Sequence, residues 1–116
     1  MSKRISPSHD EVVAALLKYE TSDTINPTVP GTTECVYDDG FGRHCIAGQV
    51  VVDLGGEIPF NEFTARPLNG TISVVHEQLG EFDFRSLELL RKAQNAADQM
   101  VPWSKVIDQL RQDGAL

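Results

Sequence analysis

The sequence predicts a mainly α-helical protein, a compact bundle of four to five short helices with at most one small β-hairpin near residues 34–43. Three observations support this fold class. Apolar residues recur at helical spacing in most segments, capping residues precede several of these runs, and glycines follow them. With 116 residues, of which 41% are hydrophobic, the chain is expected to form one domain over residues 1–116 around a single core.

The first helix is predicted over residues 9–20. Ser8 and Glu11 match the capping box, in which each side chain accepts a hydrogen bond from the backbone N–H of the other residue. We expect residues 1–7 to be frayed and the proline-containing stretch 21–33 to be a loop. The buried face of the helix is expected to consist of Val12, Val13, Leu16 and Leu17.

Two segments in the middle of the chain fit either a helix or a strand. In residues 44–54 the three consecutive valines favour a strand, but a shared apolar face followed by Gly55 favours a helix. We predict a helix there. Residues 71–79 alternate as a strand would, yet they also fit a short helix closed by Gly80, which we favour. The helical face of the first segment would contain Ala47, Val50, Val51 and Leu54.

The C-terminal third carries the clearest helical signals. Asp83 is expected to cap a helix from residue 84 to about 100, and Pro102 to lie in the first turn of the next helix. Little chain joins the two helices, so they must bend sharply at residues 101–102. The first is expected to bury Leu87, Leu90, Ala93, Ala97 and Met100, and the second Trp103, Val106, Ile107 and Leu110.

The formal charge of −7 is distributed unevenly along the chain. Residues 20–83 hold eleven acids against two arginines, a net charge of −9, whereas residues 1–19 and 84–116 each carry +1. A nucleic-acid partner is not expected, because phosphate contacts need clustered lysines and arginines. The longest aliphatic run is three valines, too short to span a membrane, and acids at positions 10 and 11 interrupt any secretory leader. The expected location is therefore cytoplasmic.

Several short motifs follow one another between residues 34 and 116. They are Cys35-x-Tyr37, a glycine-bearing turn, His44-Cys45-Ile46-Ala47-Gly48-Gln49, Leu54-Gly55, Ala93-Gln94 with Asp98, and Trp103. In these motifs the chain resembles small uncharacterised proteins of actinobacteria and their phages. The resemblance implies a compact, mostly helical, intracellular domain that a phage could encode. It brings no activity, ligand or catalytic residue with it, and the acidic turn Asp38-Asp39 departs from the pattern.

Cys35, His44 and Cys45 are the candidate catalytic residues, for a small Cys/His enzyme or a thiol site. A reactive thiolate needs a lowered pKa, which a helix N-terminus or a histidine can provide. Neighbouring residues of a helix point about 100° apart, so His44 is better placed to pair with Cys35 than with Cys45. The simpler interpretation is two small buried hydrophobes beside a surface imidazole, and an enzyme is the less favoured hypothesis.

No metal or other cofactor is expected. His76 or Asp38 would complete four zinc ligands with the cysteines and His44, but the spacing differs from that of known zinc sites. The turn Asp38-Asp39-Gly40 lacks the alternating acids and closing glutamate of a calcium loop. The sequence also contains no phosphate-binding glycine motif and no nucleophile-elbow motif.

Aromatic residues in predicted turns of the acidic block suggest a protein-binding surface, because such surfaces combine aromatic anchors with a charged rim. We therefore predict a non-enzymatic acidic module that docks on a basic or amphipathic protein surface; if phage-encoded, it would modify a host protein. The alternatives are aromatic plugs at the ends of a helical core and a homo-oligomer formed through residues 84–112. The predicted partner-binding residues are Tyr37, Asp38, Asp39, Phe41, Phe60 and Phe63.

Overall fold

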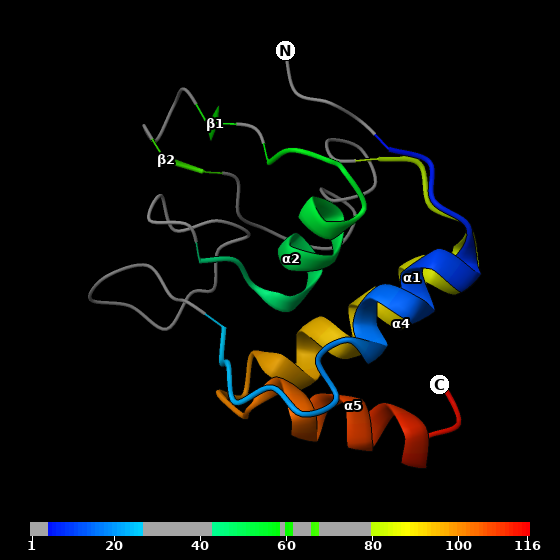
Figure 1. Ribbon diagram of the computed structural model, residues 1–116, viewed down its shortest axis with the longest axis vertical. Coiled ribbons are helices and arrows are strands. Elements are labelled where there is room, and N and C mark those ends of the chain that lie inside the picture. Colours follow the sequence, from blue (N-terminus) through cyan, green and yellow to red (C-terminus); the bar gives the residue numbers. More distant parts are fainter. Residues whose placement is uncertain (1–4, 27–42, 59, 62–65, 68–79) are drawn as a thin grey trace.

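The structure, a computed structural model, describes residues 5–26, 43–58, 60–61, 66–67 and 80–116. Within these ranges the chain forms four helices, which confirms the predicted mainly helical class. α4 is the central helix and contacts the other three (Figure 1). The helices are α1 (His9–Leu17), α2 (Ile46–Asp53), α4 (Phe84–Ala97) and α5 (Trp103–Gln112).

A two-residue antiparallel ladder joins β1 (Phe60–Asn61) to β2 (Arg66–Pro67), with Phe60 opposite Pro67. The hairpin expected near residues 34–43 lies, apart from its last residue, outside the described ranges, as does the segment 71–79. The described residues therefore contain one short ladder beside a helical core.

α1 begins as predicted and ends earlier. Ser8 Oγ accepts a hydrogen bond from the Glu11 N–H at 3.2 Å, and Glu11 Oε1 accepts one from the Ser8 N–H at 3.0 Å, so the capping box is complete. The helix ends at Leu17 rather than at residue 20, because the next residues form turns with bonds three residues back. Val12, Ala15 and Leu16 are buried, whereas the predicted Val13 and Leu17 are only partly buried.

The ambiguous segment 44–54 contains a helix, as predicted, but a shorter one. Cys45 is the N-cap of α2 rather than part of it, and Leu54 is the C-cap. The valines are helical because Val50 and Val51 are buried on a face that packs on α1 and α4. Gly55 follows with φ of +94°, the left-handed conformation that terminates many helices and suits glycine.

α4 is capped by Asp83, whose Oδ1 accepts a hydrogen bond from the Ser86 N–H at 2.7 Å. It ends at Ala97 rather than near residue 100. Met100, predicted to be buried, is therefore displaced from the helical face and is 48% exposed. Leu87 is only partly buried. The buried apolar residues of α4 are Leu89, Leu90, Ala93, Ala96 and Ala97.

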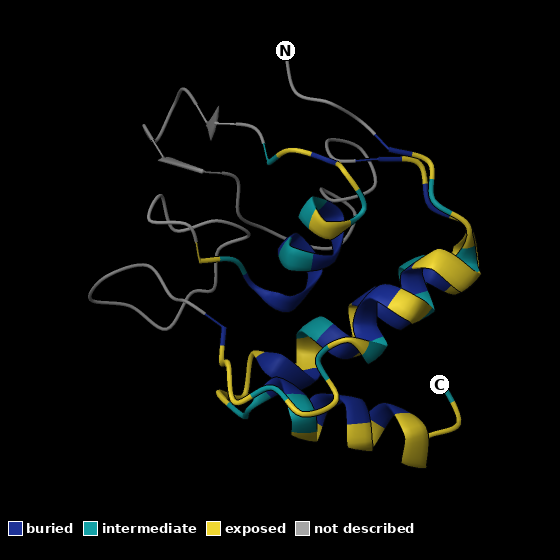
Figure 2. Ribbon diagram, in the orientation of Figure 1, coloured by how far each residue is buried: buried dark blue, intermediate teal, exposed yellow. Residues whose placement is uncertain are grey.

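α5 buries the four residues predicted for it, Trp103, Val106, Ile107 and Leu110. Pro102 is the N-cap rather than a residue of the first turn, and no side chain caps this helix. Figure 2 shows the buried faces of the helices turned toward one another, with exposed residues on the outer sides.

Ile5 is attached to the core, whereas residues 1–4 of the segment expected to fray lie outside the described ranges. Ile5 is buried, forms a parallel bridge with Gly80, and accepts a hydrogen bond from the Glu81 N–H at 2.8 Å. A Cβ atom on Gly80 would lie 2.5 Å from the Ile5 carbonyl oxygen, so only glycine permits this approach without displacement.

Candidate functional site

Asn26 joins three helices through a side chain that is only 2% exposed. Its Oδ1 accepts hydrogen bonds from the Ile46 N–H at 2.9 Å, where α2 begins, and from Trp103 Nε1–H at 3.0 Å, where α5 begins. Its Nδ2 donates to Asp98 Oδ1 at 3.2 Å, where α4 ends. Asn26, in the predicted loop 21–33, is therefore a structural junction that sequence reasoning missed.

The N-terminus of α2 has all of its first four N–H groups hydrogen-bonded within the protein. Free N–H groups at a helix start attract anions, but those of residues 46–49 already have acceptors. This helix end is consequently a packing contact rather than a ligand site. The acceptors, in order, are Asn26 Oδ1, Gln94 Oε1, Cys45 Sγ and the Cys45 carbonyl.

Of the candidate catalytic residues, the structure describes His44 and Cys45. Cys45 is completely buried, and its sulfur accepts the Gly48 N–H at 3.4 Å. His44 is partly buried, and Cys35 lies outside the described ranges. A reactive thiol needs access as well as a low pKa, so burial gives Cys45 a structural role in capping α2. Among the described residues, no three His, Cys, Asp or Glu side chains are grouped as metal ligands would be.

Most of the predicted partner-binding residues cannot be placed. Tyr37, Asp38, Asp39, Phe41 and Phe63 lie outside the described ranges. Phe60 begins β1, and the structure describes only its backbone. Their role in binding remains a prediction.

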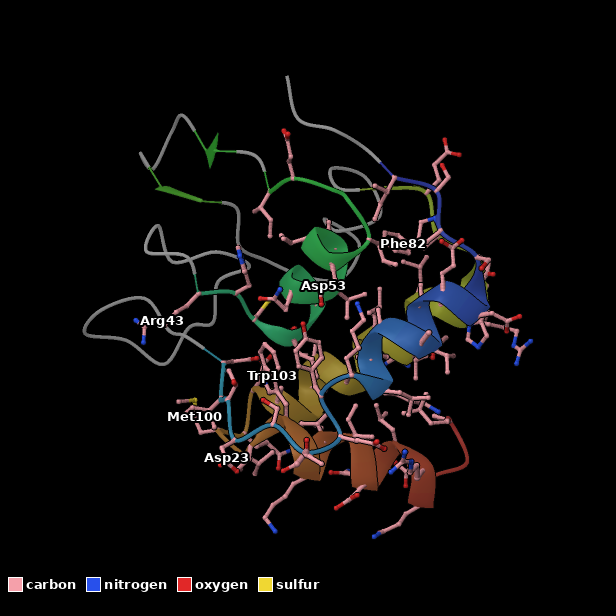
Figure 3. The ribbon with its side chains drawn as sticks, in the orientation of Figure 1. Asp23, Arg43, Asp53, Phe82, Met100 and Trp103 are labelled. Atoms are coloured by element: carbon pink, nitrogen blue, oxygen red, sulfur yellow. The ribbon has the colours of Figure 1, made fainter. Side chains whose placement is uncertain are left out.

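Six carboxylates of the acidic block belong to the described residues, and all are exposed. One forms an ion pair, Glu20 with Arg111 at 2.6 Å. The segments that carry them belong to different parts of the molecule, namely the turns after α1, the end of α2 and the chain before α4 (Figures 1 and 3). They are Glu20, Asp23, Asp53, Glu57, Glu81 and Asp83.

The connection between α4 and α5 is bound to the segment that follows α1. The Thr24 carbonyl accepts the Trp103 N–H at 2.8 Å, and the Ser22 carbonyl accepts the Ser104 N–H at 3.0 Å. These two carbonyls take the place of a side-chain cap for α5. These two hydrogen bonds hold residues 22–25 beside residues 100–104, and we call the residues around them the α4–α5 corner. It consists of Asp23, Ile25, Met100, Val101 and Pro102, of which Figure 3 labels Asp23 and Met100.

The α4–α5 corner exposes two large apolar side chains. Ile25 is 43% exposed and Met100 is 48% exposed, while Val101 and Pro102 are half-buried and Asp23 is exposed. Met100 has φ of 62°, and it is the one non-glycine residue in the described ranges with a positive φ. The left-handed conformation costs roughly 1–2 kcal/mol for a residue with a Cβ atom. Met100 therefore carries backbone strain without contributing a buried side chain.

An aromatic pair joins the turn after α1 to the first residue of α5. The Tyr19 ring meets Trp103 edge to face, with centroids 5.0 Å apart and an interplanar angle of 86°. The Tyr19 hydroxyl donates to Asp53 Oδ2, and Gln49 Nε2 donates to Asp53 Oδ1 at 2.8 Å. Burial, followed by the hydrogen bond to Asp53 and its charge, raises the pKa of Tyr19. The phenol therefore stays protonated and keeps its donor role.

Comparisons of the chain with protein-family models, with curated proteins and with solved structures found no match. None of the helices in the described ranges has the length and apolar character needed to cross a membrane.

Proposed function

We propose that this chain is a non-enzymatic protein-binding module and that the α4–α5 corner is its contact surface. The observation that carries the proposal is Met100, which combines an exposed apolar side chain with a left-handed backbone. Glycine or asparagine at the end of a helix would avoid both costs. Methionine is common on adaptable binding surfaces, because its flexible thioether fits varied apolar partners.

The partner favoured by this surface is a basic, amphipathic protein segment. Ile25 and Met100 offer apolar contact, and the exposed carboxylates of Asp23 and Asp98 lie on the two segments that form the corner. The charge of −7 would steer a basic partner toward the chain, and salt would weaken this attraction. If the chain is phage-encoded, the partner we propose is a protein of the bacterial host.

The other two hypotheses have less support. The thiol site would need access to Cys45, whose sulfur is buried beneath the start of α2. A homo-oligomer through residues 84–112 would need a continuous apolar surface there, yet Leu90, Ile107 and Leu110 are buried in the chain's own core. The exposed apolar residues of this range, Phe84 and Met100, lie at opposite ends of α4.

The test compares the native chain with Ile25→Asp and Met100→Asp as immobilised baits in bacterial lysate. Gln112→Asp, which adds the same charge at an exposed position at the end of α5, is the matched control. We expect a basic protein to be retained at low salt by the native chain and the control and lost from both corner variants. With the purified partner, titration calorimetry should show at least a tenfold weaker Kd, about 1.4 kcal/mol.

Met100→Gly separates binding from folding. It removes the side chain together with the strain, so it should raise the free energy of unfolding by about 1 kcal/mol while weakening partner binding. Met100→Ala keeps the strain and should weaken binding without this gain. Equal retention by all variants, or no salt-sensitive capture at all, would overturn the proposal.

A further inference from the structure

The other end of α4 carries a surface hollow of about 230 Å³ between α1, α4 and the C-terminal residues. Phe84 lines it and is 77% exposed, more than any other large hydrophobic residue in the described ranges. Ligand pockets for small molecules and cofactors usually measure about 300–1,000 Å³, so this hollow suits a single side chain better than a cofactor. Its other lining residues include His9, Arg85, Glu88, Lys92 and Ala115.

Two basic side chains, Arg85 and Lys92, line the hollow although the whole chain is acidic. Arg85 and Lys92 are seven residues apart on α4 and therefore lie on the same face, and neither forms a salt bridge with a described residue. Glu88 lies between them and is neutralised by Arg91, with Nη2 to Oε2 at 2.6 Å. Asp83 lies close to Arg85 and offsets part of its charge, while its Oδ1 caps α4 by accepting the Ser86 N–H.

The walls of the hollow are held in place by hydrogen bonds. His9 Nδ1 lies 3.1 Å from Ser86 Oγ and joins the start of α1 to α4. After α5, Gly114 has φ of +75°, and the Ala115 N–H donates to the Leu110 carbonyl at 2.9 Å. Figure 1 shows the C-terminus beside the end where α1 and α4 begin. A preformed surface loses little conformational entropy on binding.

We propose that this hollow binds an acidic segment of a partner protein. One apolar side chain of that segment would pack on Phe84, and flanking carboxylates would pair with Arg85 and Lys92. The 14 residues of α4 separate this surface from the α4–α5 corner by about 21 Å. The inference thus adds a second binding surface for a partner of opposite charge, and it does not depend on the corner.

The experiment uses the full chain and an array of short fluorescein-labelled peptides, each with one apolar residue flanked by glutamates, lysines or serines. We expect fluorescence anisotropy at low salt to select glutamate-flanked peptides and Lys92→Glu or Phe84→Ala to weaken their binding at least tenfold. Lys105→Glu, the same charge reversal on the exposed side of α5, should have little effect. Met100→Asp should also leave this binding intact.

Three outcomes would overturn the inference. Lysine-flanked peptides could bind as well as glutamate-flanked ones, or Lys92→Glu could bind glutamate peptides normally. The third outcome is self-association in sedimentation, abolished by Lys92→Glu and unaccompanied by peptide binding, which would assign the hollow to a second copy. Because Lys92 and Phe84 are exposed, both variants should keep the native fold, which thermal melting verifies.

Discussion

Asn26 meets the hydrogen-bonding needs of three helix ends with one amide. Its oxygen accepts hydrogen bonds from the Ile46 N–H and from Trp103 Nε1–H, and its nitrogen donates one to Asp98. The side chain itself is buried. A buried donor without an acceptor is costly, so the geometry leaves little freedom at this position. A carboxylate here would also face Asp98, whose oxygen accepts from the amide nitrogen.

Replacing Asn26 with alanine should strongly destabilise the fold. The change leaves the Ile46 N–H and the Trp103 Nε1–H without an acceptor, at about 1–3 kcal/mol each. We expect the free energy of unfolding, measured by urea denaturation, to fall by about 2–4 kcal/mol. Asn95→Ala, at an exposed position on α4, is the control. Equal costs for the two variants would show that Asn26 is not a junction.

Tyr19 makes the fold sensitive to high pH. Burial and Asp53 raise the pKa of Tyr19 in the folded chain above the ordinary value of 10.0. At a pH between the ordinary pKa and the raised one, the phenol is ionised in the unfolded chain and neutral in the folded chain. Stability should therefore decrease as the pH rises above 10. Tyr19→Phe should remove this part of the decrease. Urea midpoints at about pH 8 and pH 11 provide the measurement.

At the scale of elements, local signals defined the helices well. The capping box at Ser8, the cap at Asp83 and the buried face of α5 all follow from short-range spacing, which depends only on helix geometry. The segment 44–54 was harder, because valines favour strands unless a helical face packs on neighbouring helices. The periodic apolar face and the following Gly55 correctly indicated a helix in this segment.

Contacts between distant segments had no comparable signal. The α5 cap comes from the Ser22 and Thr24 carbonyls, which every residue type possesses. Met100 matches the helical period of α4, so sequence spacing assigned it to the core, and only the helix end at Ala97 exposes it. Of the residues that form the proposed binding surfaces, Ile25, Met100 and Phe84 were therefore not identified as candidates.

The cap of α4 should respond to acid. The hydrogen bond from the Ser86 N–H, aided by nearby His9 and Arg85, lowers the pKa of Asp83 below its ordinary value of 3.8. The stabilisation is thus present above pH 3.8 and is lost as the pH falls through the lower, folded-state pKa.

The Asp83→Asn variant keeps an acceptor oxygen for the Ser86 N–H, but its side chain cannot titrate. Between pH 5 and pH 2, the urea concentration at its unfolding midpoint should therefore fall by less than that of the native chain. Asp83→Ala should be less stable than either at pH 7. Asp108→Asn, at an exposed position in α5 that caps no helix, is the control. A native chain that tracks the asparagine variant in acid would disprove this role for the carboxylate.

At the scale of the whole molecule, segments far apart in the chain meet around Ile5. A Cβ atom on Gly56 would lie 3.4 Å from Ile5 Cγ2 and 2.6 Å from Val51 Cγ1, and one on Gly80 would meet the Ile5 backbone. Two glycines therefore let the N-terminal segment pack against the end of α2 and the start of the α4 region. This contact fixes the N-terminal segment over the core.

Gly80→Ala should disturb the contact between Ile5 and Gly80, because the atom nearest to the new Cβ is the Ile5 carbonyl oxygen, which cannot rotate away as a side chain could. We expect a loss of about 1–3 kcal/mol in the free energy of unfolding, as for overpacked cores. Ser6→Ala, an exposed change in the same segment, should be nearly neutral. Thermal and urea denaturation measure both variants, and similar midpoints would contradict the close approach.

The borrowed cap of α5 has a consequence for deuterium exchange. First-turn amides of most helices exchange rapidly, because water is their usual acceptor. Here the protons of Trp103 and Ser104 are held by carbonyls from the chain after α1, and that of Ile46 by a buried amide. These three amide protons should exchange among the slowest in the protein. Their exchange rates should therefore report global unfolding, which first-turn amides of a helix usually do not.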